Sequence, residues 1–195
     1  MVGFYRVVDF NSPQEARASA EDWNGIILLP LIDPASAGGK WLSSPEGRRV
    51  LSFKTGTDIL IIYPNAENNI DFVALSNGLC EAFAEHGHDL RRVHPEPAVL
   101  IIENGLEKCT VVRLCRPDGL ANMKEADLVR RGMIRIIDGL INGSGTAALL
   151  KAEAEFVDFF MSIENAAPLF ANFARKISGM KVEALFRSAL DWLKA

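Results

Sequence analysis

The sequence has few cysteines: Cys80, Cys109 and Cys115 are the only three among 195 residues. Small secreted domains that depend on disulfides carry more cysteines, in even numbers. The sparse, odd set argues against a disulfide scaffold and favours a reducing compartment. No histidine neighbours any of the three, so we interpret them as core or half-buried residues and not as nucleophiles.

The sequence also lacks a long hydrophobic run. A membrane-spanning helix needs ~18 or more consecutive apolar residues, and no such stretch is present. Residues 1–17 lack the basic start, apolar stretch and small-residue cleavage site of a secretory signal peptide. We therefore expect a cytoplasmic protein without a membrane partner.

Basic residues are not in excess. The formal net charge is −4 and the isoelectric point is about 5.4, whereas proteins that bind nucleic acid usually carry a basic stripe or a high isoelectric point. We do not expect nucleic acid as a partner. A local basic cluster of Lys124, Arg130, Arg131 and Arg135 is interpreted as a solvated helix face, on which Asp127 is expected to pair with Arg131.

Apolar residues are abundant, at 49% of the chain. A domain of this length buries roughly 70% of the surface that its unfolded chain exposes. The chain is therefore long enough to form a core without disulfides or metal, and nothing in it calls for a cofactor. The length suits one compact domain, or one domain with a helical extension.

Near-continuous apolar runs in the first part of the chain are typical of strands buried on both faces. A further pair of apolar arms is joined around Asn104 and Gly105, a dipeptide that favours the positive φ angles of a tight hairpin turn. The expected strands are 4–10, 25–33, 57–64 and 89–94, together with a hairpin at 97–115.

Serine followed by proline marks two helix starts, because serine caps a helix and proline suits its first position. Residues 34–42, which contain Gly38 and Gly39, are expected to form a loop. The helices expected before residue 142 are 13–23, 45–53, 70–86 and 125–141.

No strand is expected beyond residue 117. Residues 146–167 and 182–193 are predicted to be helices, with Pro168 interrupting the segment between them. The predicted fold is thus α/β (or α+β): a mixed, largely buried sheet of about five to six strands with helices on its faces, and an all-helical C-terminal part. We divide the chain into an α/β domain, 1–116, and a helical region, 117–195, that packs on it or mediates assembly.

All three histidines, His86, His88 and His94, fall within 81–97 beside several acids, which raises the possibility of a metal site. The alternative is the end of a helix, at which Gly87 takes a left-handed conformation and His86 meets the negative end of the helix dipole. This second interpretation also explains the apolar stripe before Gly87. We therefore predict no metal site.

The loop 33–44 is the candidate ligand-binding site, because open α/β sheets bind ligands at the carboxyl ends of their strands. Its glycines could turn backbone N–H groups toward an anion, and its lysine would add positive charge. The candidate residues are Asp33, Ser36, Gly38, Gly39 and Lys40. The loop is not a phosphate-binding P-loop, since Pro34 and Trp41 stand where that motif needs glycine and a hydroxyl residue.

A magnesium site is a weaker hypothesis for the same edge. Asp9 and Asp33 each end a predicted strand, and they could hold Mg²⁺ together if those strands were parallel neighbours. Aspartates at strand ends also serve commonly as turn or cap residues.

The sequence identifies no catalytic residue and leaves open whether the protein is an enzyme. The favoured hypothesis is a non-catalytic interaction or regulatory protein whose apolar-rich C-terminal region binds a protein partner or a second copy, as in a homo-oligomer. The alternative is an enzyme or sensor that binds a small anion or nucleotide at the strand ends, in the 33–44 loop.

Overall fold

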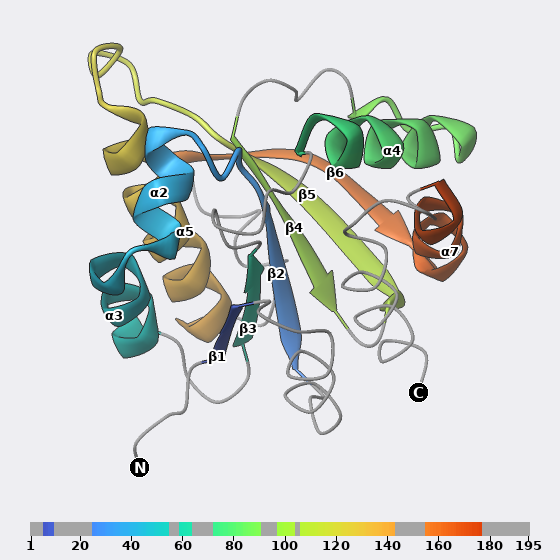
Figure 1. The fold of residues 1–195 in the computed structure, drawn as a ribbon, viewed down its shortest axis with the longest axis horizontal. Coiled ribbons are helices and arrows are strands. Elements are labelled where there is room, and N and C mark those ends of the chain that lie inside the picture. The colour runs from blue at the N-terminus through green and yellow to red at the C-terminus, as the bar shows by residue number, and fades with distance from the viewer. Residues whose placement is uncertain are drawn as a thin grey trace.

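The apolar runs form one mixed sheet of six strands (Figure 1). The computed structural model describes residues 6–9, 25–54, 59–63, 72–90, 97–103, 106–142 and 155–176. The strands are β1 (Arg6–Asp9), β2 (Ile26–Leu31), β3 (Ile59–Tyr63), β4 (Ala98–Glu103), β5 (Lys108–Leu114) and β6 (Val157–Glu164). Their order in the sheet is β1-β3-β2-β4-β5-β6. The first three in this order are parallel, and β2, β4, β5 and β6 pair antiparallel in turn.

The central strands are buried on both faces, as predicted. Along β4, Leu100 and Ile102 belong to one hydrophobic cluster, while Val99 and Ile101 belong to the other. None of the four is more than 3% exposed. Burial of an aliphatic side chain of this size contributes about 1.5–3 kcal/mol. The sheet therefore needs a helical layer on each side.

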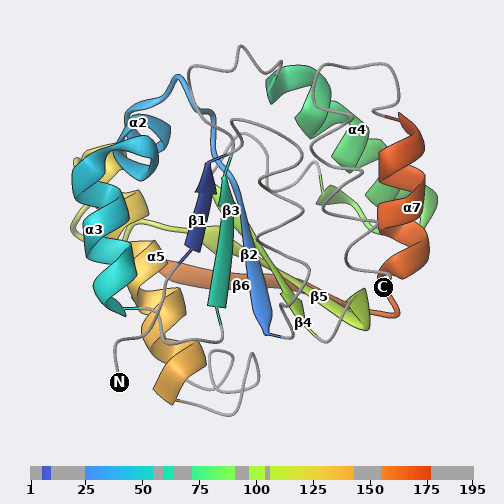
Figure 2. The same cartoon turned by 60° about the horizontal axis from the view of Figure 1, so that its bottom comes forward.

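Two helical layers supply this cover (Figures 1 and 2). The helices α4 (Phe72–Glu85) and α7 (Ala167–Lys176) pack on one face. The other face is covered by α2 (Ala37–Ser43), α3 (Pro45–Lys54) and α5 (Glu125–Asn142). Among these three, α5 contributes the most buried apolar side chains, namely Leu128, Val129, Met133, Ile136, Ile137 and Leu140. None of the helices in the described ranges is both long and apolar enough to cross a membrane.

The predicted start of α3 is confirmed. Pro45 opens the helix, and the Ser44 hydroxyl accepts a hydrogen bond from the Gly47 N–H at 3.0 Å. This bond satisfies one of the N–H groups that the first turn of a helix leaves without an internal partner.

The end of α4 shows why the histidines follow it. Gly87 has a φ angle of +81°, and its N–H donates to the Ala84 carbonyl at 3.0 Å. The His88 N–H donates to the Phe83 carbonyl at 2.9 Å, which completes the hydrogen-bond pair typical of a left-handed helix end. His86 Nδ1 lies 2.9 Å from the Ala82 carbonyl oxygen. The helix-end interpretation is therefore confirmed, while His94 lies outside the described residues.

The prediction of a loop at 34–42 is wrong, because residues 37–43 form α2. The helix begins at Ser36, whose hydroxyl accepts from the Gly39 N–H at 3.1 Å. Glycine lowers helix propensity, but here it permits close packing. A Cβ added at Gly38 would lie 2.5 Å from Val129 Cγ2 of α5, so tertiary contact overrides the local preference.

The prediction of an all-helical C-terminal part is also wrong, since residues 157–164 of the expected helix 146–167 form β6. Val157, Phe159, Met161 and Ile163 recur at every second position, which is the period of a strand. The Ala-, Leu- and Glu-rich residues just before them favoured a helix and hid this signal. Phe160 is an extra residue opposite the Val111–Val112 step of β5 and forms a bulge.

Other predictions have mixed outcomes. The hairpin 97–115 is confirmed by β4 and β5, and the helices expected at 70–86 and 125–141 correspond to α4 and α5. At 89–94, Asp89 and Leu90 are not in a strand, and the rest lies outside the described residues. The helices expected at 13–23 and 182–193 also lie outside them. The division at residue 116 stays a prediction, although strands from both sides of it share the sheet.

Substitution of Gly38 by alanine should destabilise the protein by about 1–2 kcal/mol, because overpacking against Val129 outweighs the gain in helix propensity. Urea unfolding of the Gly38→Ala variant measures this change. The double variant Gly38→Ala/Val129→Ala should lose less stability than the two single variants added together. A stability equal to that of the parent chain would contradict the close packing of α2 on α5.

Candidate ligand-binding site

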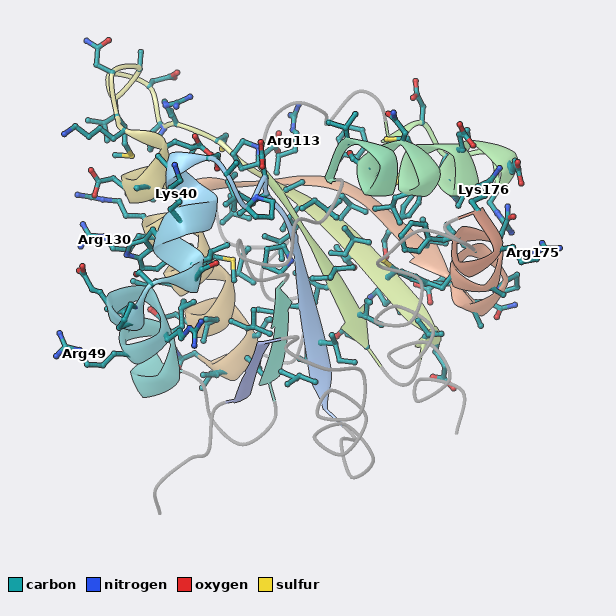
Figure 3. The ribbon with its side chains drawn as sticks, viewed as in Figure 1. Lys40, Arg49, Arg113, Arg130, Arg175 and Lys176 are labelled. Carbon is teal, nitrogen blue, oxygen red and sulfur yellow. The ribbon has the colours of Figure 1, made fainter. Side chains whose placement is uncertain are left out.

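The residues predicted to bind an anion lie at and before the start of α2, and most of them have structural roles. Asp33 Oδ1 accepts a hydrogen bond from the Ala35 N–H at 2.8 Å, as in a turn. The Gly39 N–H, which an anion would need, is bonded to Ser36. Lys40 is exposed (Figure 3). This segment therefore offers fewer free donors than the sequence indicates, and anion binding there stays a prediction.

The observed strand order removes the basis of the magnesium hypothesis, which required the strands that end in Asp9 and Asp33 to be neighbours. β3 lies between β1 and β2, so Asp9 and Asp33 do not follow neighbouring strands. Within the described ranges, no group of three or more His, Cys, Asp or Glu residues could hold a metal ion.

None of the three cysteines forms a disulfide bond, and two of them lie in the core. Cys80 and Cys109 are buried, and Cys115 is half-buried. Burial raises the pKa of the Cys109 thiol, so this side chain stays protonated at neutral pH. Because the thiolate is the reactive form of cysteine, Cys109 is poorly suited to act as a nucleophile.

The basic cluster on α5 is divided between two roles. Arg130, and not Arg131 as predicted, pairs with Asp127, with Nη2 and Oδ1 3.2 Å apart. The Arg131 guanidinium lies over the ring of Phe156, with its central carbon 5.4 Å from the ring centroid. At this distance a cation is attracted to the electron-rich face of the ring.

Phe156, just before β6, holds an uncommon backbone conformation. Its φ angle is +72°, which costs of order 1–3 kcal/mol in a residue other than glycine. Its carbonyl accepts a hydrogen bond from the Cys115 N–H at 3.1 Å, and its side chain belongs to the cluster beneath α5. Burial, this bond and the Arg131 contact together oppose the strain and fix the ring against α5.

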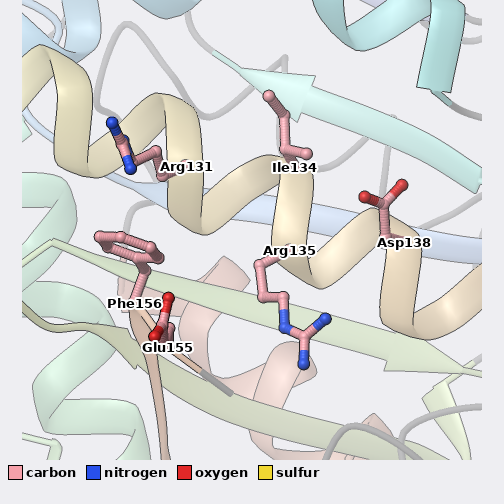
Figure 4. A pocket seen from close by; sticks show the side chains of 6 residues that line it. All are labelled: Arg131, Ile134, Arg135, Asp138, Glu155 and Phe156. Atoms are coloured by element: carbon pink, nitrogen blue, oxygen red, sulfur yellow. The ribbon is translucent and has the colours of Figure 1, made fainter. Parts of the chain in front are cut away.

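A hollow of about 480 Å³ lies between α5 and this turn (Figure 4). Its volume falls within the range of small-molecule sites, about 300–1,000 Å³. Six residues line it: Arg131, Ile134, Arg135 and Asp138 from α5, and Glu155 and Phe156 from the turn.

The lining mixes both signs of charge with apolar surface. Arg131 and Arg135 face the same space as Asp138 and Glu155, while Ile134 and Phe156 provide apolar wall. Within the part of the chain that the structure describes, neither Arg135 nor Glu155 takes part in an ion pair. The hollow can therefore offer charged hydrogen-bond groups to a small molecule.

Sequence reasoning found only part of this site. Arg131 and Arg135 belong to the predicted basic cluster, and Asp138 lies near it, but the sequence marks none of Ile134, Asp138, Glu155 and Phe156 as a binding residue. Glu155 and Phe156 fall within the helix predicted at 146–167, so no local pattern brings them to α5. The strand alternation from Val157 onward is the signal that could have revealed the turn before it.

Comparison with protein-family models, with curated proteins and with solved structures finds no match for this chain. The candidate site consequently rests on the geometry of the chain itself.

On the opposite face of the sheet, a polar cluster joins α4 to α7. Lys176 Nζ lies 2.6 Å from Glu85 Oε1 and 3.3 Å from Glu81 Oε2, and the Asn172 amide donates to Glu85. The hydrogen bond from Lys176 lowers the pKa of Glu85, and the same bond raises the pKa of Lys176. The cluster ties two helices together and contributes nothing to the hollow.

The ion pairs between Lys176 and the acids of α4 should make the stability of the protein depend on pH. Because the pKa of Glu85 is lowered by folding, its contribution is present above its ordinary value of 4.5 and is lost as the pH falls through the folded value. The pKa of Lys176 is raised, so its contribution persists through neutral pH and is lost only in strong alkali. In Glu85→Gln the melting temperature should therefore fall less steeply on acidification below pH 4.5 than in the parent chain.

Melting curves recorded between neutral pH and pH 3 measure this slope. The exposed Glu107 lies outside the cluster, so Glu107→Gln serves as the matched control. Identical acid slopes for Glu85→Gln and Glu107→Gln would show that the tie does not contribute to stability.

Proposed function

We propose that this protein is a non-catalytic regulatory protein that binds a small ligand in the hollow between α5 and the turn at Glu155 and Phe156. The supporting observation is a hollow of about 480 Å³ that two arginines, two acids and two apolar side chains line. All six lie within residues 117–195, the region expected to bind a protein partner or a second copy.

Preorganisation supports ligand binding at this place. Arg131 is held over the Phe156 ring, and a stacked guanidinium can still donate hydrogen bonds from its edge. Ligand sites typically combine an apolar wall with a few placed polar groups. Ile134 and Phe156 form the wall, and the charged side chains supply the polar groups.

A binding role suits these residues better than a catalytic one. The guanidinium group of arginine stays protonated at every physiological pH, so it anchors a ligand and does not transfer protons. None of Cys80, Cys109 and Cys115 forms a disulfide bond, which agrees with a reducing compartment. A cytoplasmic location therefore remains part of this proposal.

A thermal-shift panel of metabolites tests the proposal. A ligand at a hundredfold excess over its dissociation constant adds about 2.7 kcal/mol to stability, which raises the melting temperature measurably. We expect at least one compound to stabilise the parent chain, and Arg135→Gln to reduce its effect. Arg175→Gln on α7, across the sheet, is the matched control and should respond like the parent. No stabilisation by any compound, or equal stabilisation of Arg135→Gln, would contradict a site in the hollow.

Self-association is a second candidate function, favoured by the position of β6. This strand is at one edge of the described sheet, and an edge strand presents backbone N–H and C=O groups that can pair with another chain. Its Phe160 and Met161 are only partly buried. A second copy that paired along β6 would extend the sheet.

Light scattering on the purified chain tests this second candidate. We expect the mass of a dimer that dissociates on dilution, because pairing through a single strand is a small contact. The mass of a monomer at every concentration would contradict self-association, and it would leave the ligand site untouched.

A further inference from the structure

We infer that the hollow between α5 and the turn at Glu155 and Phe156 takes a small zwitterion, a molecule that carries a carboxylate and an ammonium group on a short apolar scaffold. This inference rests on the proposed function and adds the chemical class of the ligand. The simplest such compound is a free amino acid with an apolar side chain.

The balance of charge in the lining selects this class. Arg131 and Arg135 contribute two positive charges, and Asp138 and Glu155 contribute two negative ones. A polyanion such as a nucleotide would be attracted by the arginines but repelled by both acids, and a simple cation would be attracted by the acids but repelled by both arginines. A ligand that has one charge of each sign can place each charge beside its opposite, so it gains attraction at both ends.

The available charges belong to Arg135 and Glu155. Arg131 already lies over the Phe156 ring, and Asp138 makes an interaction of its own. In Figure 4, Arg135 extends from α5 away from Ile134, on the side where Glu155 stands. We therefore assign the ligand carboxylate to Arg135, whose planar fork suits a two-oxygen partner, and the ammonium group to Glu155.

The apolar part of the ligand has a place between Ile134 and Phe156. These two side chains line the same space, and the strained turn holds the Phe156 ring in a fixed position. A ring that is already ordered loses little conformational freedom when a ligand packs on it. An aliphatic or aromatic side chain on the ligand would remove this surface from water.

Isothermal titration calorimetry of the full chain, with ligands that lack one charge at a time, tests the inference. The probes are L-leucine and L-phenylalanine, the N-acetyl form of each, which lacks the ammonium group, and the amide of each, which lacks the carboxylate. We expect at least one of the free amino acids to bind about tenfold or more tightly than both of its derivatives. The reason is that each derivative leaves one charged side chain of the hollow without a partner.

Two variants assign the charges to residues. Glu155→Gln should remove the preference for the free amino acid over its N-acetyl form and should keep the preference over the amide. Arg135→Gln should have the opposite effect. Glu107→Gln and Arg175→Gln are exposed controls away from the hollow, and both preferences should persist in them. A purely structural effect of a variant would weaken all three ligands alike.

The outcomes separate this inference from the proposed function. If an N-acetyl derivative or an amide binds as tightly as the free amino acid, the zwitterion assignment is wrong and a ligand site in the hollow still stands. The same holds if neither amino acid binds while another compound of the thermal-shift panel acts through Arg135. If no compound of either set binds, both this inference and the proposed function are wrong.

Discussion

The burial of β4 and β5 on both faces is the constraint on which the rest of the structure depends. Apolar side chains alternate along these strands between two clusters, so neither face of the sheet can be left to water. Helices must cover both sides, and α5 must turn its apolar stripe toward the sheet. Arg131 and Arg135 lie one helical turn apart beside that stripe. The candidate site is thus a by-product of how α5 covers the sheet.

β6 completes the arrangement. By pairing with β5 it brings the turn before Val157 to the flank of α5, where Phe156 meets Arg131. The bulge at Phe160 lets the strand contribute Val157 to one cluster and Ile163 to the other, although the two residues are an even number of positions apart. An unbroken strand would have pointed both side chains to the same face.

The two helical layers are held together by different contacts. On one face, α4 and α7 come from distant parts of the chain and pack together through apolar side chains. At the surface, ion pairs from Lys176 to the acids of α4 join the two helices. On the other face, the small side chain of Gly38 lets α2 approach α5 closely. This close packing braces the helix that carries four of the six residues around the hollow.

The sequence by itself determined that β2, β3 and the hairpin 97–115 are buried strands, that α3 begins at Pro45 and α4 ends before Gly87, and that Arg131 and Arg135 share one helix. These features follow from hydrophobic period, capping chemistry and glycine at a helix end, all of which act over a few residues. Tertiary structure alone decided that 37–43 is a helix, that 157–164 joins the sheet, and that Glu155 and Phe156 stand beside α5. The physical reason is that packing and strand pairing between distant segments outweigh local propensity. The strand alternation at 157–163 is the one local sign of this pairing, and the helix-favouring residues before it hide it.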